Sequence, residues 1–164
     1  MTLSAADRLA ILDVITRADE AASRRDADGS VALFTEDAVL DGTQGRHAGQ
    51  EALRASVGPI WAAEGPATLH LTLNPVVEAG PRDGQAVARS VLLIIDPAAP
   101  PAIRAAAVIT QKLRRVGGCW RITRRTVAPA AGTSAPATSK EGLMTSTAAR
   151  QANIRHCRRR GPMS

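Results

Sequence analysis

One segment in the first third of the chain constrains the fold most, because it specifies several short elements in a fixed order. Asp26 or Asp28 can cap a short helix that runs as far as Phe34. A strand begins at about Asp37, and a Gly-x-x-x-Gly turn at residues 45–49 leads into a further helix. This alternation of short helices and strands predicts a domain in which helices and a sheet share one core.

The segment lies between a long amphipathic helix and a series of strands. Ser4 begins a capping-box pattern, and apolar residues then recur three and four positions apart as far as about residue 25. A third helix is predicted over residues 50–63, and Gly65-Pro66 ends it. Four β-rich stretches follow, at residues 68–79, 85–96, about 103–116 and 119–127. Helices first and a run of antiparallel strands afterwards indicate an α+β domain.

Most of the positive charge lies at the C-terminal end. The formal net charge is +6, of which residues 1–128 carry +1 and residues 129–164 carry +5. The second range is rich in Ala, Pro, Ser and Thr without an apolar period, which predicts a disordered tail after a domain at 1–128. The basic cluster Arg158–Arg160 has no aromatic residues interleaved, so a solvated tail is favoured over a nucleic-acid-binding arm.

Composition narrows the cellular setting. Two cysteines are too few for a disulfide framework, which fits a reducing cytoplasm with Cys119 as a small core residue. The longest apolar run, Val91–Ile95, is too short to span a bilayer, and we find no signal-peptide pattern. We therefore expect a cytoplasmic protein without membrane contact. Arginine far outnumbers lysine, which is typical of a GC-rich bacterial genome.

Four pieces of sequence carry a resemblance to a known family. They are residues 26–41, residues 45–53, His70-Leu71-Thr72-Leu73-Asn74-Pro75-Val76-Val77 and Gly118-Cys119-Trp120-Arg121-Ile122-Thr123-Arg124. In this order they resemble the SnoaL-like domains of the nuclear transport factor 2-like superfamily, over residues 4–128. The resemblance implies a cone-shaped, cystatin-like α+β fold, in which about three N-terminal helices wrap a curved antiparallel sheet around one small-molecule pocket.

The resemblance also implies a range of functions. Relatives with known chemistry include polyketide cyclases, a ketosteroid isomerase, scytalone dehydratase and limonene epoxide hydrolase, which act by proton transfer or hydration without a metal or an organic cofactor. Other relatives bind ligands without catalysis. Many members carry a Tyr and an Asp on the first helix, where this chain has Ala18 and Ser23. These departures weaken the inference of an enzyme.

His70 and Asp41 are the candidate catalytic residues. His70 begins a strand of Leu, Thr and Val, and it matches a His that the family often points into the cavity; a histidine can move a proton near neutral pH. The alternative is a strand-end His bonded to backbone or solvent. Asp41 ends the first strand and could orient His70 or act as a base, or it could simply form a turn before Gly42.

Ser23, Trp61, Asn74 and Arg89 are the candidate ligand-binding residues. Ser23 can line the cavity, although the sequence supplies no base to make it a nucleophile. Trp61 covers the cavity or is plain core, and Asn74 is a polar residue within a strand. By strand alternation Arg89 shares an apolar face, where it binds an anionic or carbonyl group or pairs with an acid at a subunit interface. Arg124 poses the same question, whereas Asp19 is expected on a solvated helix face.

Two functions therefore remain open. The first is a cofactor-free isomerase, dehydratase or cyclase that uses His70 with a carboxylate. The second is a non-catalytic module of the same fold that binds a ligand or dimerises. In both, the expected partner is an apolar or carbonyl-bearing small molecule, and the family resemblance implies a homodimer. The sequence has no zinc-ligand spacing and no phosphate-binding glycine loop, so we expect no metal and no cofactor.

Overall fold

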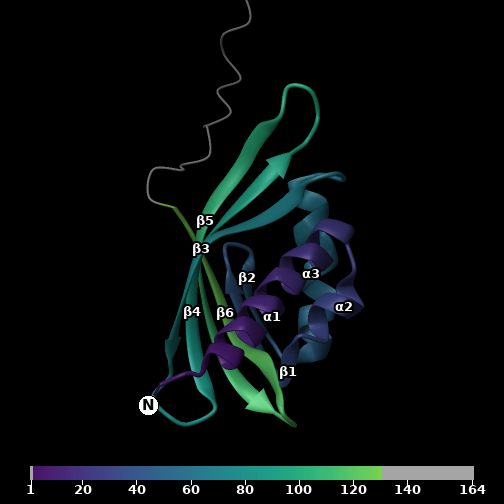
Figure 1. Ribbon diagram of the computed structural model, residues 1–164. Coiled ribbons are helices and arrows are strands. Elements are labelled where there is room, and N and C mark those ends of the chain that lie inside the picture. Colours follow the sequence, from purple (N-terminus) through teal and green to yellow (C-terminus); the bar gives the residue numbers. More distant parts are fainter. Residues whose placement is uncertain (1, 131–164) are drawn as a thin grey trace, which may run out of the picture. The chain divides into compact units, whose positions relative to one another are not determined.

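The computed structural model describes residues 2–130, in which three helices pack against one six-stranded sheet (Figure 1). The helices are α1 (Ala5–Arg24), α2 (Ala27–Val31) and α3 (Gln50–Glu64). The strands are β1 (Phe34–Gly42), β2 (Gly45–Ala48), β3 (Leu69–Ala79), β4 (Gln85–Asp96), β5 (Ala102–Val116) and β6 (Cys119–Pro129). The predicted α+β class is confirmed.

The helix caps follow the sequence signals. The Ser4 side chain accepts a hydrogen bond from the backbone N–H of Asp7 at the start of α1, and Asp26 does the same for Gly29 at the start of α2. The prediction was wrong about where α2 stops, because Phe34 already pairs with β6 as the first residue of β1. It was also wrong about residues 45–49, most of which form β2 and pair antiparallel with β1.

The strand order across the sheet is β2-β1-β6-β5-β4-β3. The β1–β6 pair is parallel and every other pair of neighbours is antiparallel. Register shifts interrupt four of the pairings, and such bulges bend strands and increase their twist. The sheet is therefore strongly curved, and the helices cover its concave face (Figure 1).

The core lies between α1 and this concave face. Its main cluster is mostly aliphatic, with Ile11 and Ile15 of α1 and Leu113 and Ile122 of the sheet. Abundant Ala, Val, Leu and Ile compensate for the scarcity of aromatic residues, because close packing requires filled volume rather than rings. Cys119, which we expected in the core, is exposed.

The register assigns each strand residue to one of two faces. One row across the concave face consists of Leu40, Arg125, Gln111 and Ala88. The next row consists of Asp41, Thr126, Thr110 and Arg89. Since successive residues of a strand point to opposite faces, this second row lies on the convex outer face.

The outer face of β3, β4 and β5 carries an apolar patch, which we call the outer apolar face. It comprises Leu69, Leu71, Leu73, Val91, Leu93, Ile95 and Val108, which are neighbours across the sheet. The three leucines are each 41% exposed and Val108 is 45% exposed. No helix of the described chain covers this patch (Figure 1).

The C-terminal prediction extends beyond what the structure describes. Strand β6 ends at Pro129, and the expected basic tail lies outside the described residues, apart from its first two. Within residues 2–130, every helix is too short or too polar to cross a bilayer.

The conformation of Asn74 yields a test of the fold. Asn74 lies in the bulge of β3 with φ of 50°, a left-handed conformation that Gly and Asn tolerate but that costs other residues roughly 1–2 kcal/mol. Asn74→Val should lower the free energy of unfolding by about 1–2 kcal/mol, whereas Asn74→Gly should change it by less than about 0.5 kcal/mol. Urea denaturation followed by circular dichroism measures both. Equal stability of the two variants would contradict the assigned conformation.

Candidate functional site

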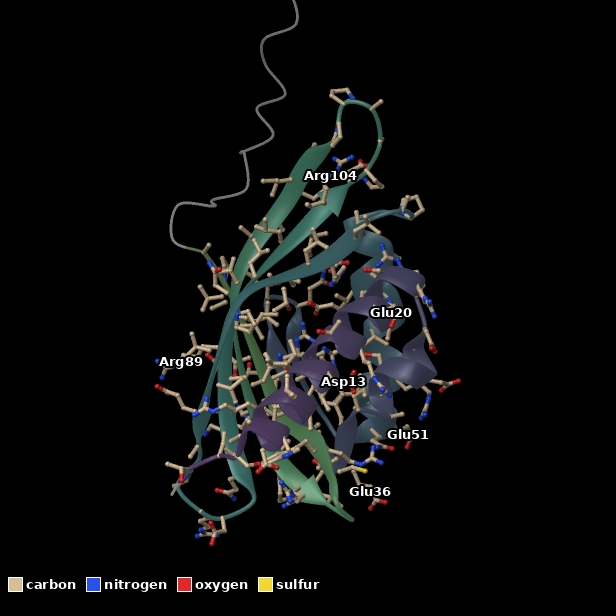
Figure 2. All side chains as sticks on the ribbon, in the orientation of Figure 1. Asp13, Glu20, Glu36, Glu51, Arg89 and Arg104 are labelled. Carbon is tan, nitrogen blue, oxygen red and sulfur yellow. The ribbon has the colours of Figure 1, made fainter. Side chains whose placement is uncertain are left out.

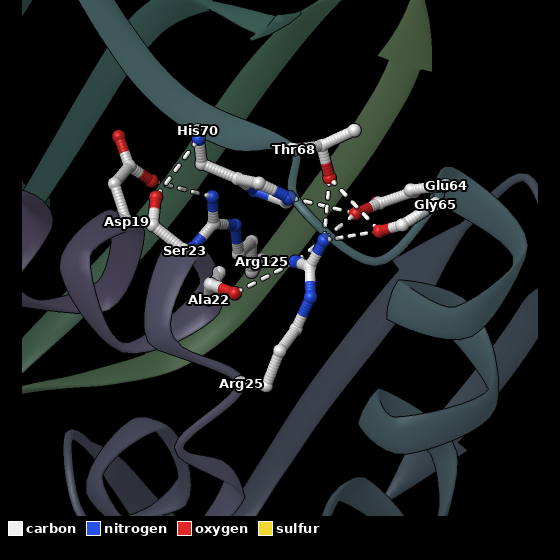
Figure 3. Close-up of polar contacts among 9 residues, drawn as sticks. All are labelled: Asp19, Ala22, Ser23, Arg25, Glu64, Gly65, Thr68, His70 and Arg125. Atoms are coloured by element: carbon white, nitrogen blue, oxygen red, sulfur yellow. Dashed lines mark hydrogen bonds and ion pairs between the residues drawn. The ribbon is translucent and has the colours of Figure 1, made fainter. Parts of the chain in front are cut away.

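His70 lies on the concave face at the start of β3 and is 8% exposed. Its Nε2 is 2.7 Å from Oε2 of Glu64, the last residue of α3. Its backbone N–H donates to Oγ of Ser23 on α1, at 2.9 Å (Figure 3). The imidazole is thus held by a carboxylate, and its backbone is attached to the long helix.

Arg25 fixes the position of Glu64. It follows α1 in the left-handed conformation, and its guanidinium donates to the carbonyl oxygens of Ala22 at 2.8 Å and Gly65 at 2.6 Å. It also donates to the hydroxyl of Thr68, and its Nη1 lies 3.8 Å from Glu64 Oε2 (Figure 3). One side chain therefore ties together the ends of two helices and the start of β3, which places Glu64 beside His70.

Asp19 and Arg125 form a buried ion pair between α1 and β6. Arg125 Nη2 lies 3.3 Å from Asp19 Oδ1, and the two side chains are 11% and 7% exposed. Thr72 of β3 donates its hydroxyl hydrogen to Asp19 Oδ2. The carboxylate is thus bonded by two strands of the concave face, as a buried charge requires.

Sequence reasoning missed both members of this pair. Asp19 was expected in solvent, yet it comes four residues after Ile15 and eight after Ile11, at helical spacing on the buried stripe. The alternation from Ile122 pointed to Arg124 as the inward arginine. A bulge leaves Thr123 unpaired opposite the Lys112–Leu113 step, so the alternation shifts by one and Arg125 turns inward instead.

Gln111 lies beside Arg125 in the same concave row. It is 1% exposed, and its Oε1 has no hydrogen-bond partner among the described residues. Burial of an unpaired carbonyl oxygen is unfavourable. A group that donates a hydrogen bond to Gln111 Oε1 would therefore be stabilised at this position.

The structure separates Asp41 and Arg89 from His70. Asp41 lies on the outer face, where its Oδ2 is 2.7 Å from Nη2 of Arg124. Arg89 is exposed on the same face and points away from the helices (Figure 2). The carboxylate beside the imidazole is Glu64, which no local sequence pattern singles out.

The other two predicted ligand-binding residues form no hydrogen bond with His70. Asn74 is exposed in the bulge of β3. Trp61 is buried between α1 and α3, in a cluster with Ala22 and Val57. Of the other five predicted residues, only Ser23 forms a hydrogen bond with His70.

A separate pocket of about 280 Å³ lies beside the start of α1. It is lined by Asp7, Arg115 and Trp120 together with residues of the β3–β4 turn, Arg82 among them. Trp120 Nε1 donates to Asp7 at 3.1 Å, and Arg115 both pairs with Asp7 and lies 5.2 Å from the centre of the Trp120 ring. The acid in this pocket is already paired, and none of the predicted site residues lines it.

Proton transfer is the chemistry that the concave face can perform. It holds a histidine bonded to a carboxylate, a second carboxylate bonded to an arginine, and an adjoining apolar cluster of Leu92, Ile94, Ala107 and Ile109. Within residues 2–130 no three His, Cys, Asp or Glu side chains lie close enough together to hold a metal ion.

The protein belongs to the SnoaL-like domain family, whose model matches residues 4–126. The resemblance of the sequence pieces is therefore confirmed. A comparison with curated proteins found no match.

Solved structures show the same fold at low sequence identity. A protein of unknown function with a cystatin-like fold from Nostoc punctiforme is 21% identical, with a TM-score of 0.74; the match covers 80% of this chain and 97% of that one. A putative scytalone dehydratase from Novosphingobium aromaticivorans is 19% identical, with a TM-score of 0.65 and coverage of 76% and 85%. ActVI-ORFA from Streptomyces coelicolor is 18% identical, with a TM-score of 0.66 and coverage of 74% and 96%. The predicted cystatin-like fold is confirmed.

The buried pair gives a stability test. Asp19→Ala or Arg125→Ala leaves one buried charge without its partner, and each should lower the free energy of unfolding by roughly 3–5 kcal/mol. The double variant should lose clearly less than the sum of the two. Urea denaturation of the four proteins measures the coupling.

The exposed pair Asp13–Arg17 on α1 is the matched control, with side chains 56% and 64% exposed. Its coupling should be about 0.3–0.5 kcal/mol. Coupling of the buried pair no larger than this would contradict its assigned role.

Proposed function

We propose that this domain binds a largely apolar small molecule against the concave face and moves a proton on it with His70. The reaction class is that of a cofactor-free isomerase, dehydratase or cyclase. The observation that carries the proposal is the buried contact of 2.7 Å between His70 Nε2 and Glu64 Oε2. Membership of the SnoaL-like family and the likeness to a putative scytalone dehydratase support it.

Glu64 takes the orienting role that the sequence offered to Asp41. A carboxylate accepts the N–H of the imidazole nitrogen that it faces, so a neutral His70 that donates from Nε2 keeps its lone pair on Nδ1. That lone pair is the base that removes a proton next to a carbonyl group, and the imidazolium so formed is stabilised by Glu64. Arg25 keeps Glu64 in place through the contacts described above.

Hydrogen–deuterium exchange of a simple ketone tests the base. We expect the protein to accelerate exchange of the α-protons of 2-tetralone in D2O, followed by proton NMR. His70→Gln should slow the protein-dependent exchange by about 10²-fold or more, since general-base catalysis contributes typically 10²–10⁴-fold. Glu64→Gln should slow it less, because the base remains but loses its orienting carboxylate.

Glu20→Gln is the matched control, because Glu20 is exposed on α1 and pairs only with Arg24 among the described residues (Figure 2). It should exchange at the wild-type rate. Exchange by His70→Gln as fast as by the wild type would exclude His70 as the base.

The outer apolar face favours a second role, self-association. Neighbouring leucines on β3 and aliphatic residues on β4 and β5 expose a continuous apolar surface, which in soluble proteins marks an interaction site. We propose that two copies pair through this face, which is compatible with either an enzyme or a binding module.

A cytoplasmic location also remains a proposal from the sequence.

Sedimentation equilibrium tests the pairing. A charged side chain at the centre of the outer apolar face should prevent a dimer, because an unpaired charge is costly to bury. Leu71→Lys should therefore shift the protein from dimer to monomer. Leu9→Lys is the control, since Leu9 is 68% exposed on α1, and it should leave the dimer intact. A wild-type monomer at all concentrations would refute the proposal.

A further inference from the structure

Charges on the concave face cancel in pairs. Asp19 is paired with Arg125, and Glu64 lies between Arg25 and His70 (Figure 3). With His70 neutral, these five side chains carry no net charge. A bound anion would therefore meet no uncompensated cation there, while it would still lose its hydration.

Arg125 nevertheless retains hydrogen-bonding capacity. Its guanidinium has five N–H donors in a fixed plane, and within residues 2–130 its side chain is bonded only to Asp19. Gln111, its neighbour across the β5–β6 pair, holds a buried Oε1 without a donor. The row therefore presents unused donors beside an unused acceptor.

An apolar surface continues directly from this row. Ile109 lies two residues from Gln111 on β5, so both side chains point to the concave face. Ile109 pairs in register with Val127 and packs with Leu92, Ile94 and Ala107. A molecule with its polar end at Gln111 would therefore have its apolar body against this cluster.

We propose that Arg125 and Gln111 recognise the polar group of the ligand, and that this group is a neutral hydroxyl or carbonyl rather than an anion. A hydroxyl suits both residues, since its hydrogen donates to Gln111 Oε1 and its oxygen accepts from Arg125. Asp19 lowers the affinity for an anionic group relative to a neutral one, because it cancels the charge of Arg125. This inference rests on the proposed function, since it requires that a small molecule binds the concave face.

Three probes of similar size separate the contributions of a hydroxyl group, an apolar ring and a negative charge: 2-naphthol, 2-methylnaphthalene and 2-naphthoate. Dissociation constants come from NMR titration at neutral pH, where the naphthol is uncharged and the naphthoate is an anion. For the wild type we expect 2-naphthol to bind about tenfold more tightly than 2-methylnaphthalene, because it satisfies an otherwise unpaired buried acceptor. We expect 2-naphthoate to bind most weakly.

Two variants then test the assigned residues. Gln111→Leu should remove the preference for 2-naphthol over 2-methylnaphthalene. Asp19→Asn leaves Arg125 without its counter-charge, so affinity for 2-naphthoate should rise about tenfold or more, a gain that misfolding cannot imitate. The double variant Asp19→Asn/Arg125→Gln is the control and should lose that gain. If Asp19→Asn does not fold, as judged by circular dichroism, the Gln111→Leu result decides alone.

The outcomes separate this inference from the proposed function. If the wild type binds none of the three probes, the proposed function fails and the inference fails with it. If 2-methylnaphthalene binds, the naphthol preference survives Gln111→Leu and the naphthoate gain is absent, the inference alone is overturned. In that case water is the partner of Gln111.

Discussion

The ion pair between Asp19 and Arg125 links the long helix to the centre of the sheet, and the concave face is arranged around it. A buried carboxylate or guanidinium is costly unless it is paired and hydrogen-bonded, so the two side chains fix each other. Thr72 of β3 adds a second strand to this contact. The register of α1 over the sheet, and with it the place of Ser23 beside His70, depends on this pair.

A second polar connection, made by Arg25, holds the C-terminal ends of α1 and α3 together. Arg25, in a left-handed conformation just past α1, bonds to the carbonyl of Gly65 just past α3 and to the hydroxyl just before β3. Glu64 and His70 meet because these chain ends are held together. The site is thus made by contacts between element ends, and its two charged pairs leave an electrically neutral surface beside an aliphatic one.

The two faces of the sheet have different chemistry. The concave face collects buried polar groups under the helices. The outer face displays leucine and valine on β3–β5 and the ion pair of Asp41 with Arg124 on β1 and β6. A single residue, Thr123, decides to which face each of the two arginines that follow it points. Because it is unpaired in the bulge of β6, Arg124 points out and Arg125 points in.

The sequence alone determined most of the elements, their order and the family, because caps, helical spacing, strand alternation and Gly-Pro punctuation are local signals. It missed β2, where a turn was expected. It singled out His70 and Ser23 as candidates, and the structure joins these two residues through a hydrogen bond. It could not identify Glu64, since nothing local tells where the end of one helix lies relative to a later strand. Nor could it identify Arg125, since a bulge depends on how two strands pair rather than on either strand's residues. The tertiary structure decided which carboxylate faces the histidine and which arginine is buried, because both follow from contacts between segments distant in sequence.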